Sequence, residues 1–195
     1  MNPDWDAWAR QQWTQRPPAS IVPVPAAGRR RELRGRRVIV GMPGLGWRAD
    51  LRADDAVVQA SRTYVPVLAE HEWYRAEAEQ VEVFAPLMPI ERVWLEVVDP
   101  SAVDSSAERL VSLDAPPRQE PTPIRDLPRV TGRRVVRIDD DGREQRDLRA
   151  VTEPYTGTGG DICVRVSPEL DWYRWVWSGN APKTTEVSAH VLWAE

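Results

Sequence analysis

The chain has 195 residues, of which 42% are hydrophobic and 29% charged, and a formal net charge of −4. This length suits one large domain or two small ones, and the composition is that of an ordinary soluble protein rather than a general nucleic-acid binder. Because there is no membrane-spanning apolar run, no secretory signal and only one cysteine, Cys163, we expect a cytoplasmic protein without disulfides or membrane contact, with Cys163 as a buried bystander.

The first predicted element is a helix that begins at Asn2, a favoured helix-capping residue, and ends before the prolines at 17 and 18. Trp5, Trp8 and Trp13 fall on one face of this helix. Because burying each ring is worth about 2–3 kcal/mol, we expect this face to dock on the chain itself or on a partner.

Residues 17–34 have the composition of a Pro-rich and then Arg-rich connector. Six arginines gather around its end, where the local field could attract phosphate or an acidic partner. The simpler interpretation is a solvated connector whose arginines pair with acids elsewhere. The arginines are Arg29, Arg30, Arg31, Arg34, Arg36 and Arg37.

From Gly35 onward the sequence occurs twice. The segments Gly-Arg-Arg-Val, Asp-Leu-Arg-Ala, Val-x-Val-x-x-Glu-x-x-Trp-Tyr-Arg and Trp-x-Glu follow Gly35 and return in the same order from Gly132. The two copies, 35–96 and 132–195, share 16 identities over 62 positions, at an offset of 97 and later 99 residues. This predicts an internal duplication with a two-residue insertion, which we expect within 156–160.

Each copy has the pattern of three strands, a short helix that carries Trp-Tyr-Arg, and a final strand that carries Trp94 or Trp193. In the second copy, Ser167 and Pro168 are typical of a helix start and Gly179 of a helix end. Between the copies we expect another helix after Asp99, followed by a second Pro-rich connector over 115–128.

The predicted fold class is therefore α+β. It consists of two tandem duplicated modules, each a mostly antiparallel sheet of about four strands with one short helix, plus the N-terminal helix. The alternative is a pair of SH3-like all-β barrels. The predicted boundaries are 1–34 for the N-terminal helix and connector, 35–98 for the first module, 99–131 for the helix and second connector, and 132–195 for the second module.

The duplication provides an internal test of possible catalytic motifs. The glycines of Gly41-x-x-Gly44-x-Gly46 resemble those of a phosphate-binding loop, but Trp47 stands where such a loop requires lysine. The second copy has an acidic Asp-Gly turn at the same positions, so we interpret the segment as a turn. The two histidines, His71 and His190, lack partners at ligand spacing. We expect no cofactor and no metal site.

Repeated charges are best explained by the scaffold. Asp50/Asp147, Glu70/Glu169 and Glu96/Glu195 are expected to pair with Arg52/Arg149 and Arg75/Arg174. A carboxylate-based enzyme with its site between the modules is a third possible function.

The second copy has Trp175 and Trp177 where the first has Ala76 and Ala78. These rings exceed what a small core needs, so we expect one of them to pack against another part of the chain or a partner. The leading hypothesis is a non-enzymatic interaction, structural or adaptor protein that uses tryptophan-rich surfaces, with self-association possible. The alternative is a nucleic-acid-associated accessory protein that binds phosphate through Arg29–Arg37.

Overall fold

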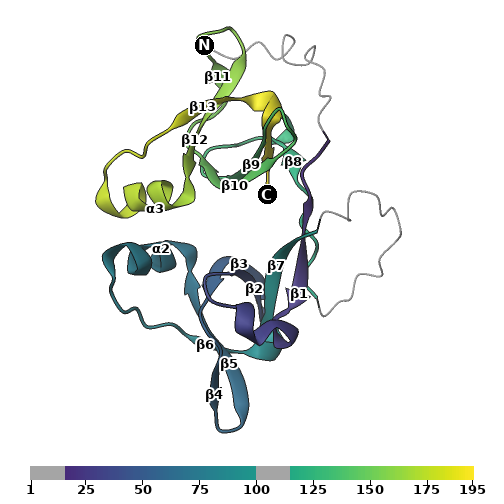
Figure 1. Ribbon diagram of the computed structural model, residues 1–195, viewed down its shortest axis with the longest axis vertical. Coiled ribbons are helices and arrows are strands. Elements are labelled where there is room, and N and C mark those ends of the chain that lie inside the picture. The colour runs from purple at the N-terminus through teal and green to yellow at the C-terminus, as the bar shows by residue number, and fades with distance from the viewer. Residues whose placement is uncertain (1–15, 100–114) are drawn as a thin grey trace. The chain divides into compact units, whose positions relative to one another are not determined.

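The computed structural model describes residues 16–99 and 115–195 (Figure 1). Contacts divide the chain into a unit Ser20–Gln119 and a unit that contains Glu120–Glu195 and the residues up to Ala19. We call them the N-terminal unit and the C-terminal unit. The predicted N-terminal helix with Trp5, Trp8 and Trp13 lies outside the described residues, as does the predicted helix after Asp99. No helix in the described ranges has both the length and the apolar character needed to cross a membrane.

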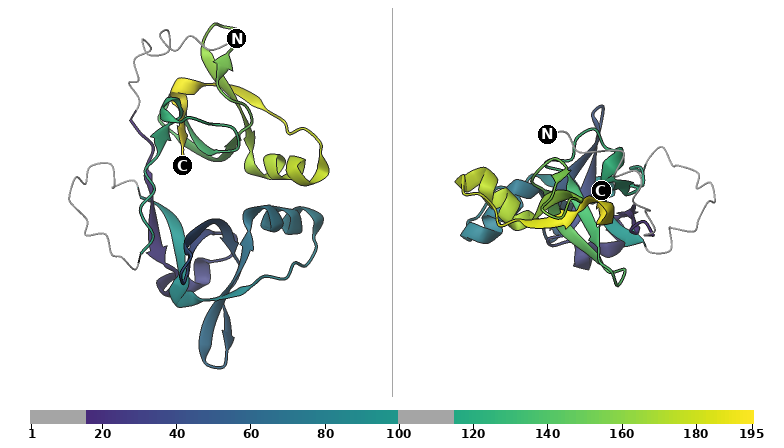
Figure 2. Two further views of the ribbon diagram at one scale, coloured as in Figure 1. Left: turned by 180° about the vertical axis from the view of Figure 1, so that it is seen from behind. Right: turned by 90° about the horizontal axis from the view of Figure 1, so that it is seen from above.

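The N-terminal unit is a sheet of seven antiparallel strands in the order β1-β7-β2-β3-β5-β4, with β6 also paired to β5. One α-helix, α2 (Glu70–Glu79), continues directly from β5 (Figures 1 and 2). A 3₁₀ turn, Ile90–Arg92, precedes the last strand. The strands are β1 (Ser20–Pro25), β2 (Arg37–Met42), β3 (Gly46–Ala53), β4 (Val57–Gln59), β5 (Arg62–Ala69), β6 (Leu87–Pro89) and β7 (Val93–Asp99).

The C-terminal unit repeats this arrangement strand for strand. Its order is β11-β12-β10-β9-β14-β8, with β13 also paired to β12. Helix α3 (Glu169–Ser178) continues from β12, and the 3₁₀ turn Ala189–Val191 precedes the last strand. The strands are β8 (Thr122–Pro123), β9 (Arg134–Ile138), β10 (Glu144–Ala150), β11 (Tyr155–Thr156), β12 (Ile162–Pro168), β13 (Thr185–Ser188) and β14 (Leu192–Ala194).

The two-sheet organisation fits the predicted duplication, but the predicted strand number was wrong, because each sheet has seven strands rather than about four. Two of the missing strands, β1 and β8, lie in segments whose prolines suggested a connector, and the others are short strands that pair with β5 or β12 inside the predicted modules. Ser20–Pro25 pairs with β7 in register from Ser20 opposite Asp99 to Pro25 opposite Trp94. Proline is tolerated there because β1 is an edge strand, where an absent N–H interrupts no ladder. Thr122–Pro123 pairs with β14 in the same way.

Strand register also corrects the predicted insertion. Val57 lies opposite Tyr64 in one unit, and Tyr155 lies opposite Cys163 in the other. The offset is therefore 97 residues at Ala53/Ala150, 98 at Val57/Tyr155 and 99 at Tyr64/Cys163. One residue is inserted before β11 and one in the hairpin that follows it, rather than both within 156–160.

Asp50 and Asp147 occupy a β-bulge that both units share. In the N-terminal unit, the register of β2 on β3 shifts between Val38 and Val40. In the C-terminal unit, the register of β9 on β10 shifts between Gln145 and Leu148. Asp50 has φ of 56° and Asp147 has φ of 60°, in the left-handed region that Asp tolerates better than most residues. The repeated aspartates thus stand at a bend of the scaffold.

The core of each unit consists of alternate residues along the strands, and the aliphatic residues that both copies share lie in it. Along β5, Val65 and Val67 are buried, as are Val164 and Val166 along β12. Val38/Val135, Leu51/Leu148 and Ala53/Ala150 are buried in the same two cores.

Glu153 holds the turn that precedes Gly132 in the C-terminal unit. Its carboxylate oxygens accept hydrogen bonds from the Val130 and Thr131 backbone N–H groups at 2.9 and 3.1 Å. Burial alone would raise the pKa of Glu153, but these hydrogen bonds and the charge of Arg129 outweigh it, so the pKa lies below its ordinary value of 4.5.

This lowered pKa predicts acid sensitivity of the C-terminal unit. A carboxylate whose pKa falls on folding stabilises the folded state above its unfolded pKa, and that stabilisation is lost as the pH falls through the folded pKa. We therefore expect the variant Glu153→Gln to be less stable than the wild type at neutral pH and to lose less stability between about pH 5 and about pH 3. Urea midpoints across this range measure both effects, and equal acid losses in the two proteins would contradict the assignment.

Candidate interaction surface

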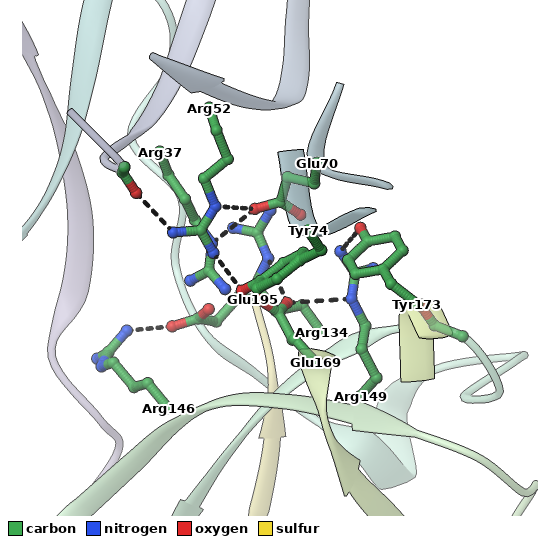
Figure 3. Close-up of polar contacts among 12 residues, drawn as sticks. Arg37, Arg52, Glu70, Tyr74, Arg134, Arg146, Arg149, Glu169, Tyr173 and Glu195 are labelled. Atoms are coloured by element: carbon green, nitrogen blue, oxygen red, sulfur yellow. Dashed lines mark hydrogen bonds and ion pairs between the residues drawn. The ribbon is translucent and has the colours of Figure 1, made fainter. Parts of the chain in front are cut away.

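A buried network of arginine, glutamate and tyrosine joins the helix to the sheet in the N-terminal unit (Figure 3). Glu70, the first residue of α2, is 1% exposed and accepts hydrogen bonds from Arg37 Nε at 2.9 Å and Arg52 Nε at 3.1 Å. The Arg52 guanidinium also donates to the Gly35 carbonyl at 2.8 Å and to the Tyr74 hydroxyl at 2.7 Å. Tyr74 lies about one helical turn after Glu70, so both side chains reach the same face of the sheet.

The C-terminal unit builds the same network from the corresponding residues. Glu169, also 1% exposed, accepts a hydrogen bond from Arg149 Nε at 3.1 Å and forms an ion pair with Arg134 at 3.7 Å. Arg149 donates to the Gly132 carbonyl at 3.1 Å and to the Tyr173 hydroxyl at 2.7 Å. Its guanidinium carbon lies 5.2 Å from the centroid of the Tyr173 ring.

The shared glycines and tryptophans belong to the same structure. Gly35 has φ of 73° and Gly132 has φ of 82°, which favours glycine because a side chain is strained there. The ring of Trp73 packs on Gly35, 3.6 Å from where a Cβ atom on that glycine would stand. The ring of Trp172 packs on Gly132 in the same way, at 3.9 Å. The repeated Gly-Arg-Arg and Trp-Tyr-Arg motifs are therefore parts of one scaffold.

These contacts confirm that Arg52 and Arg149 pair with Glu70 and Glu169. Because the carboxylates are buried between arginines, we assign them to the fold rather than to proton transfer.

The predicted pairing of the other repeated arginines was wrong. Arg75 pairs with Glu79 at 2.9 Å and Arg174 with Asp171 at 3.5 Å, each within its own helix and on its exposed face. Since i,i+4 and i,i+3 partners are always near on a helix, these contacts need no tertiary structure. Glu195 pairs with Arg146, whose position in the first copy is Ala49.

The six candidate anion-binding arginines have different surroundings. Arg37 is held by Glu70, and Arg34 lies within 4.0 Å of Asp54, Asp55 and Glu77. The other four are exposed: Arg29, which pairs with Glu32 at 3.5 Å, and Arg30, Arg31 and Arg36. Three of the six, Arg29, Arg34 and Arg37, are thus within ion-pair distance of acids of their own unit.

Cys163 is buried on β12, as expected, opposite Ser188 on β13. Burial and the Glu186 carboxylate raise the pKa of its thiol, which keeps the sulfur protonated at neutral pH. Gly157 packs against it so closely that an added Cβ would lie 2.7 Å from the sulfur. His190 shares a hydrogen bond of 2.6 Å with the Ser188 hydroxyl. Within the described ranges, no three His, Cys, Asp or Glu side chains are grouped as a metal site would require.

Helix α3 carries the tryptophans that distinguish the second copy. Trp175 is 36% exposed, and its neighbour Val176 is 62% exposed. Trp177 is half-buried. Leu170, in the first turn of the same helix, is also exposed. Leu170 points to a different side of the helix, so we call Trp175 and Val176 the α3 surface.

A second exposed apolar group follows α2 in the N-terminal unit, between the helix and β6. Phe84, the only phenylalanine of the chain, is 90% exposed. Sequence reasoning missed this group, although an apolar run directly after a helix end could have indicated it. We call these residues the loop surface: Val81, Val83, Phe84 and Leu87.

The register of the strands shows which positions correspond across these two surfaces. Tyr64 pairs with Pro89 in the first copy, and Cys163 pairs with Ser188 in the second, at an offset of 99 residues on both strands. The helices also correspond at this offset, and each ends in a left-handed residue, Gln80 or Gly179. Residues 70–91 and 169–190 therefore align without gaps.

The large exposed apolar residues in the described part of the two copies all lie at positions that the copies do not share. The shared aliphatic residues of the strands, by contrast, are buried. The scaffold alone does not require the exposed residues, since the other unit folds in the same way without them. The exposed residues and their counterparts are Leu45/Gly142, Trp47/Glu144, Val58/Thr156, Val81/Asn180, Val83/Pro182, Phe84/Lys183, Leu87/Glu186, Leu170/His71, Trp175/Ala76 and Val176/Glu77.

The fold and these surfaces define a duplicated two-sheet protein with a buried arginine–glutamate network in each unit and apolar surfaces specific to each copy. No protein-family model matches the chain, and neither the curated proteins nor the solved structures include a match.

Proposed function

We propose that this protein is a non-enzymatic, cytoplasmic adaptor that binds protein partners through the loop surface of its N-terminal unit and the α3 surface of its C-terminal unit. The observation that carries this proposal is the division between shared and unshared positions. The shared aliphatic side chains are buried and the shared aromatic ones are buried or half-buried, whereas Phe84, Trp175 and Val176 are exposed where the other copy has Lys183, Ala76 and Glu77. Exposed aromatic and aliphatic side chains in groups are typical of binding surfaces.

We also propose that each unit is an SH3-like small barrel with a helix inserted before its last strand. The strand order supports this architecture, because the first strand pairs with the last, which in turn pairs with the second, followed by the third and fourth main strands. The 3₁₀ turn ahead of the last strand supports it as well. Such folds host many functions, so the function is argued from the surfaces alone.

The arginine-rich segment supports a nucleic-acid function less well. Arg34 and Arg37 face acids of their own unit, which leaves fewer cations for a phosphate backbone.

Site-specific photo-crosslinking in the source cells tests the adaptor proposal. A benzoylphenylalanine residue at position 84 or 175 should form discrete protein adducts, and the same residue at the exposed Asp140 should form none. Mass spectrometry of the adducts distinguishes a partner protein from a second copy of this chain. Absence of adducts at both surfaces, or equal adducts at position 140, would contradict the proposal.

Exchange variants separate binding from folding. Phe84→Lys and the double variant Trp175→Ala, Val176→Glu introduce residues that already stand at the same positions of the other copy. We expect each to leave thermal stability almost unchanged while it removes the adducts formed from its own surface.

A further inference from the structure

The acidic residues around the loop surface indicate which kind of partner it takes. Five exposed glutamates lie on α2, in the loop and in the 3₁₀ turn after β6: Glu72, Glu77, Glu79, Glu82 and Glu91. Arg75 neutralises Glu79, and Arg34 lies near Glu77. Within the described ranges no arginine or lysine forms an ion pair with the remaining three.

This acidity is specific to the first copy. Four of the five positions carry no acid in the second copy, where the residues are Val176, Ser178, Ala181 and His190. Because both copies fold on the same network, the scaffold does not require the additional charges. Clustered like charges repel one another, so they favour a partner that brings the opposite charge.

The loop surface continues along β6 into a pocket. Leu87 and Pro89 alternate with Met88, which packs on the core, so both lie on the outer face of β6. Pro89 stands opposite Tyr64 on β5. A pocket of about 360 Å³ opens there, lined by Arg62, Thr63, Tyr64, Pro89 and Glu91. Its lining is mixed, with Arg62, Thr63 and Glu91 as polar groups and Tyr64 and Pro89 as the apolar part.

The same face of the C-terminal unit has polar residues in place of Leu87, Pro89 and Pro66, with the buried Cys163 in place of Tyr64. Its residues are Glu186 and Ser188 on β13, with Cys163 and Arg165 on β12. Arg165 and Glu186 are already linked there through the Tyr155 hydroxyl, at 3.3 and 2.5 Å. Of the two described units, only the N-terminal unit combines this exposed apolar loop with the additional exposed glutamates.

We propose that the loop surface and the adjoining pocket bind a cationic apolar segment of a partner protein, with bulky apolar side chains on Phe84 and in the pocket, and lysine or arginine side chains facing Glu82 and Glu91. This inference rests on the proposed adaptor function and adds the chemistry of the partner. Negative charge beside exposed apolar residues disfavours an anionic membrane surface, which would be repelled.

Defined peptides test the charge and the surface separately. The probe is a fluorescein-labelled synthetic peptide of leucine, phenylalanine and lysine, measured by fluorescence anisotropy against the full chain. One control peptide has glutamate in place of every lysine, and a second control peptide has serine in place of every apolar residue. We expect the cationic peptide to bind at least about tenfold more tightly than either control peptide. Its binding should weaken as the salt concentration is raised, because exposed charge pairs are screened.

Exchange variants locate the binding. Phe84→Lys and Glu82→Ala introduce the second-copy residues and should each weaken binding of the cationic peptide several-fold, Phe84→Lys the more strongly, since it removes the ring and adds a repelling charge. Leu45→Gly is the matched control, because it also introduces a second-copy residue at an exposed apolar position, but on the β2–β3 hairpin. It should leave binding unchanged.

Each other outcome contradicts the inference. Equal binding of the cationic and acidic peptides through Phe84 would refute the charge preference while leaving the adaptor function intact. Binding unaffected by Phe84→Lys, or absent for all peptides, would remove the surface itself from the inference. If the full chain bound phosphatidylcholine vesicles but no peptide, and Phe84→Lys removed the vesicle binding, the loop surface would be assigned to a lipid. The photo-crosslinking result decides the adaptor function independently.

Discussion

Replacement of Glu169 by alanine is expected to destabilise the C-terminal unit by about 3–5 kcal/mol, the usual cost of removing one partner from a buried ion pair. The carboxylate is 1% exposed and lies against Arg149 and Arg134, which are themselves nearly buried. Without it, two nearly buried guanidinium groups lose the carboxylate that both of them contact. The loss exceeds the value of the ion pair itself, because it includes the desolvation of both cations.

Hydrogen exchange resolved by peptide measures this effect unit by unit. The chain has two compact units, so a single global unfolding energy is not assumed. Peptides from β9 and β12 should exchange much faster in Glu169→Ala, and Glu70→Ala should do the same to β2 and β5.

Glu79→Ala is the matched control for this prediction, because Glu79 pairs with Arg75 on an exposed helix face. Its cost should stay below about 0.5 kcal/mol. A loss in Glu169→Ala no larger than this control would contradict the scaffold role of the network.

Replacement of Arg149 by lysine is expected to cost about 2–3 kcal/mol, although it keeps the charge. Arg149 directs three separate nitrogens to the Glu169 carboxylate, the Gly132 carbonyl and the Tyr173 hydroxyl. An ammonium group at the end of a flexible chain does not reproduce this planar fork, so at least one buried acceptor loses its donor.

Arg174→Lys is the control for this second prediction. Arg174 is also shared by both copies, but it is exposed and contacts only Asp171 in its own helix, at 3.5 Å. Urea unfolding followed by exchange of the C-terminal peptides should separate the two variants clearly. Equal stability of Arg149→Lys and Arg174→Lys would show that the fork geometry is unimportant.

The two repeated arginines also illustrate how far sequence reasoning reached. Both occur at matching positions of the two copies, and the sequence predicted that both pair with repeated acids. Only Arg52/Arg149 do so. Their partners lie 18 and 20 residues away along the chain, so the pairing depends on the strand register that carries each arginine to the start of the helix. The sequence contains the charges but not that register.

The proline-rich segments were misinterpreted for a related reason. Ser20–Pro25 has two prolines and reads as an extended connector, yet it forms an edge strand on β7. Extended backbone is common to both states, and only the presence of a partner strand distinguishes them. That partner, residues 93–99, lies about seventy residues further along the chain.

By itself, the sequence determined that the chain contains two copies of one structural plan and that Gly35/Gly132, Arg52/Arg149 and Glu70/Glu169 belong to it, because residues kept in both copies make the same contacts in both. Only the tertiary structure decided which arginine meets which acid, which proline-rich segments are strands, and that Phe84 and Trp175 are exposed. The physical reason is that burial and pairing depend on distant parts of the chain, which local patterns of residues do not encode.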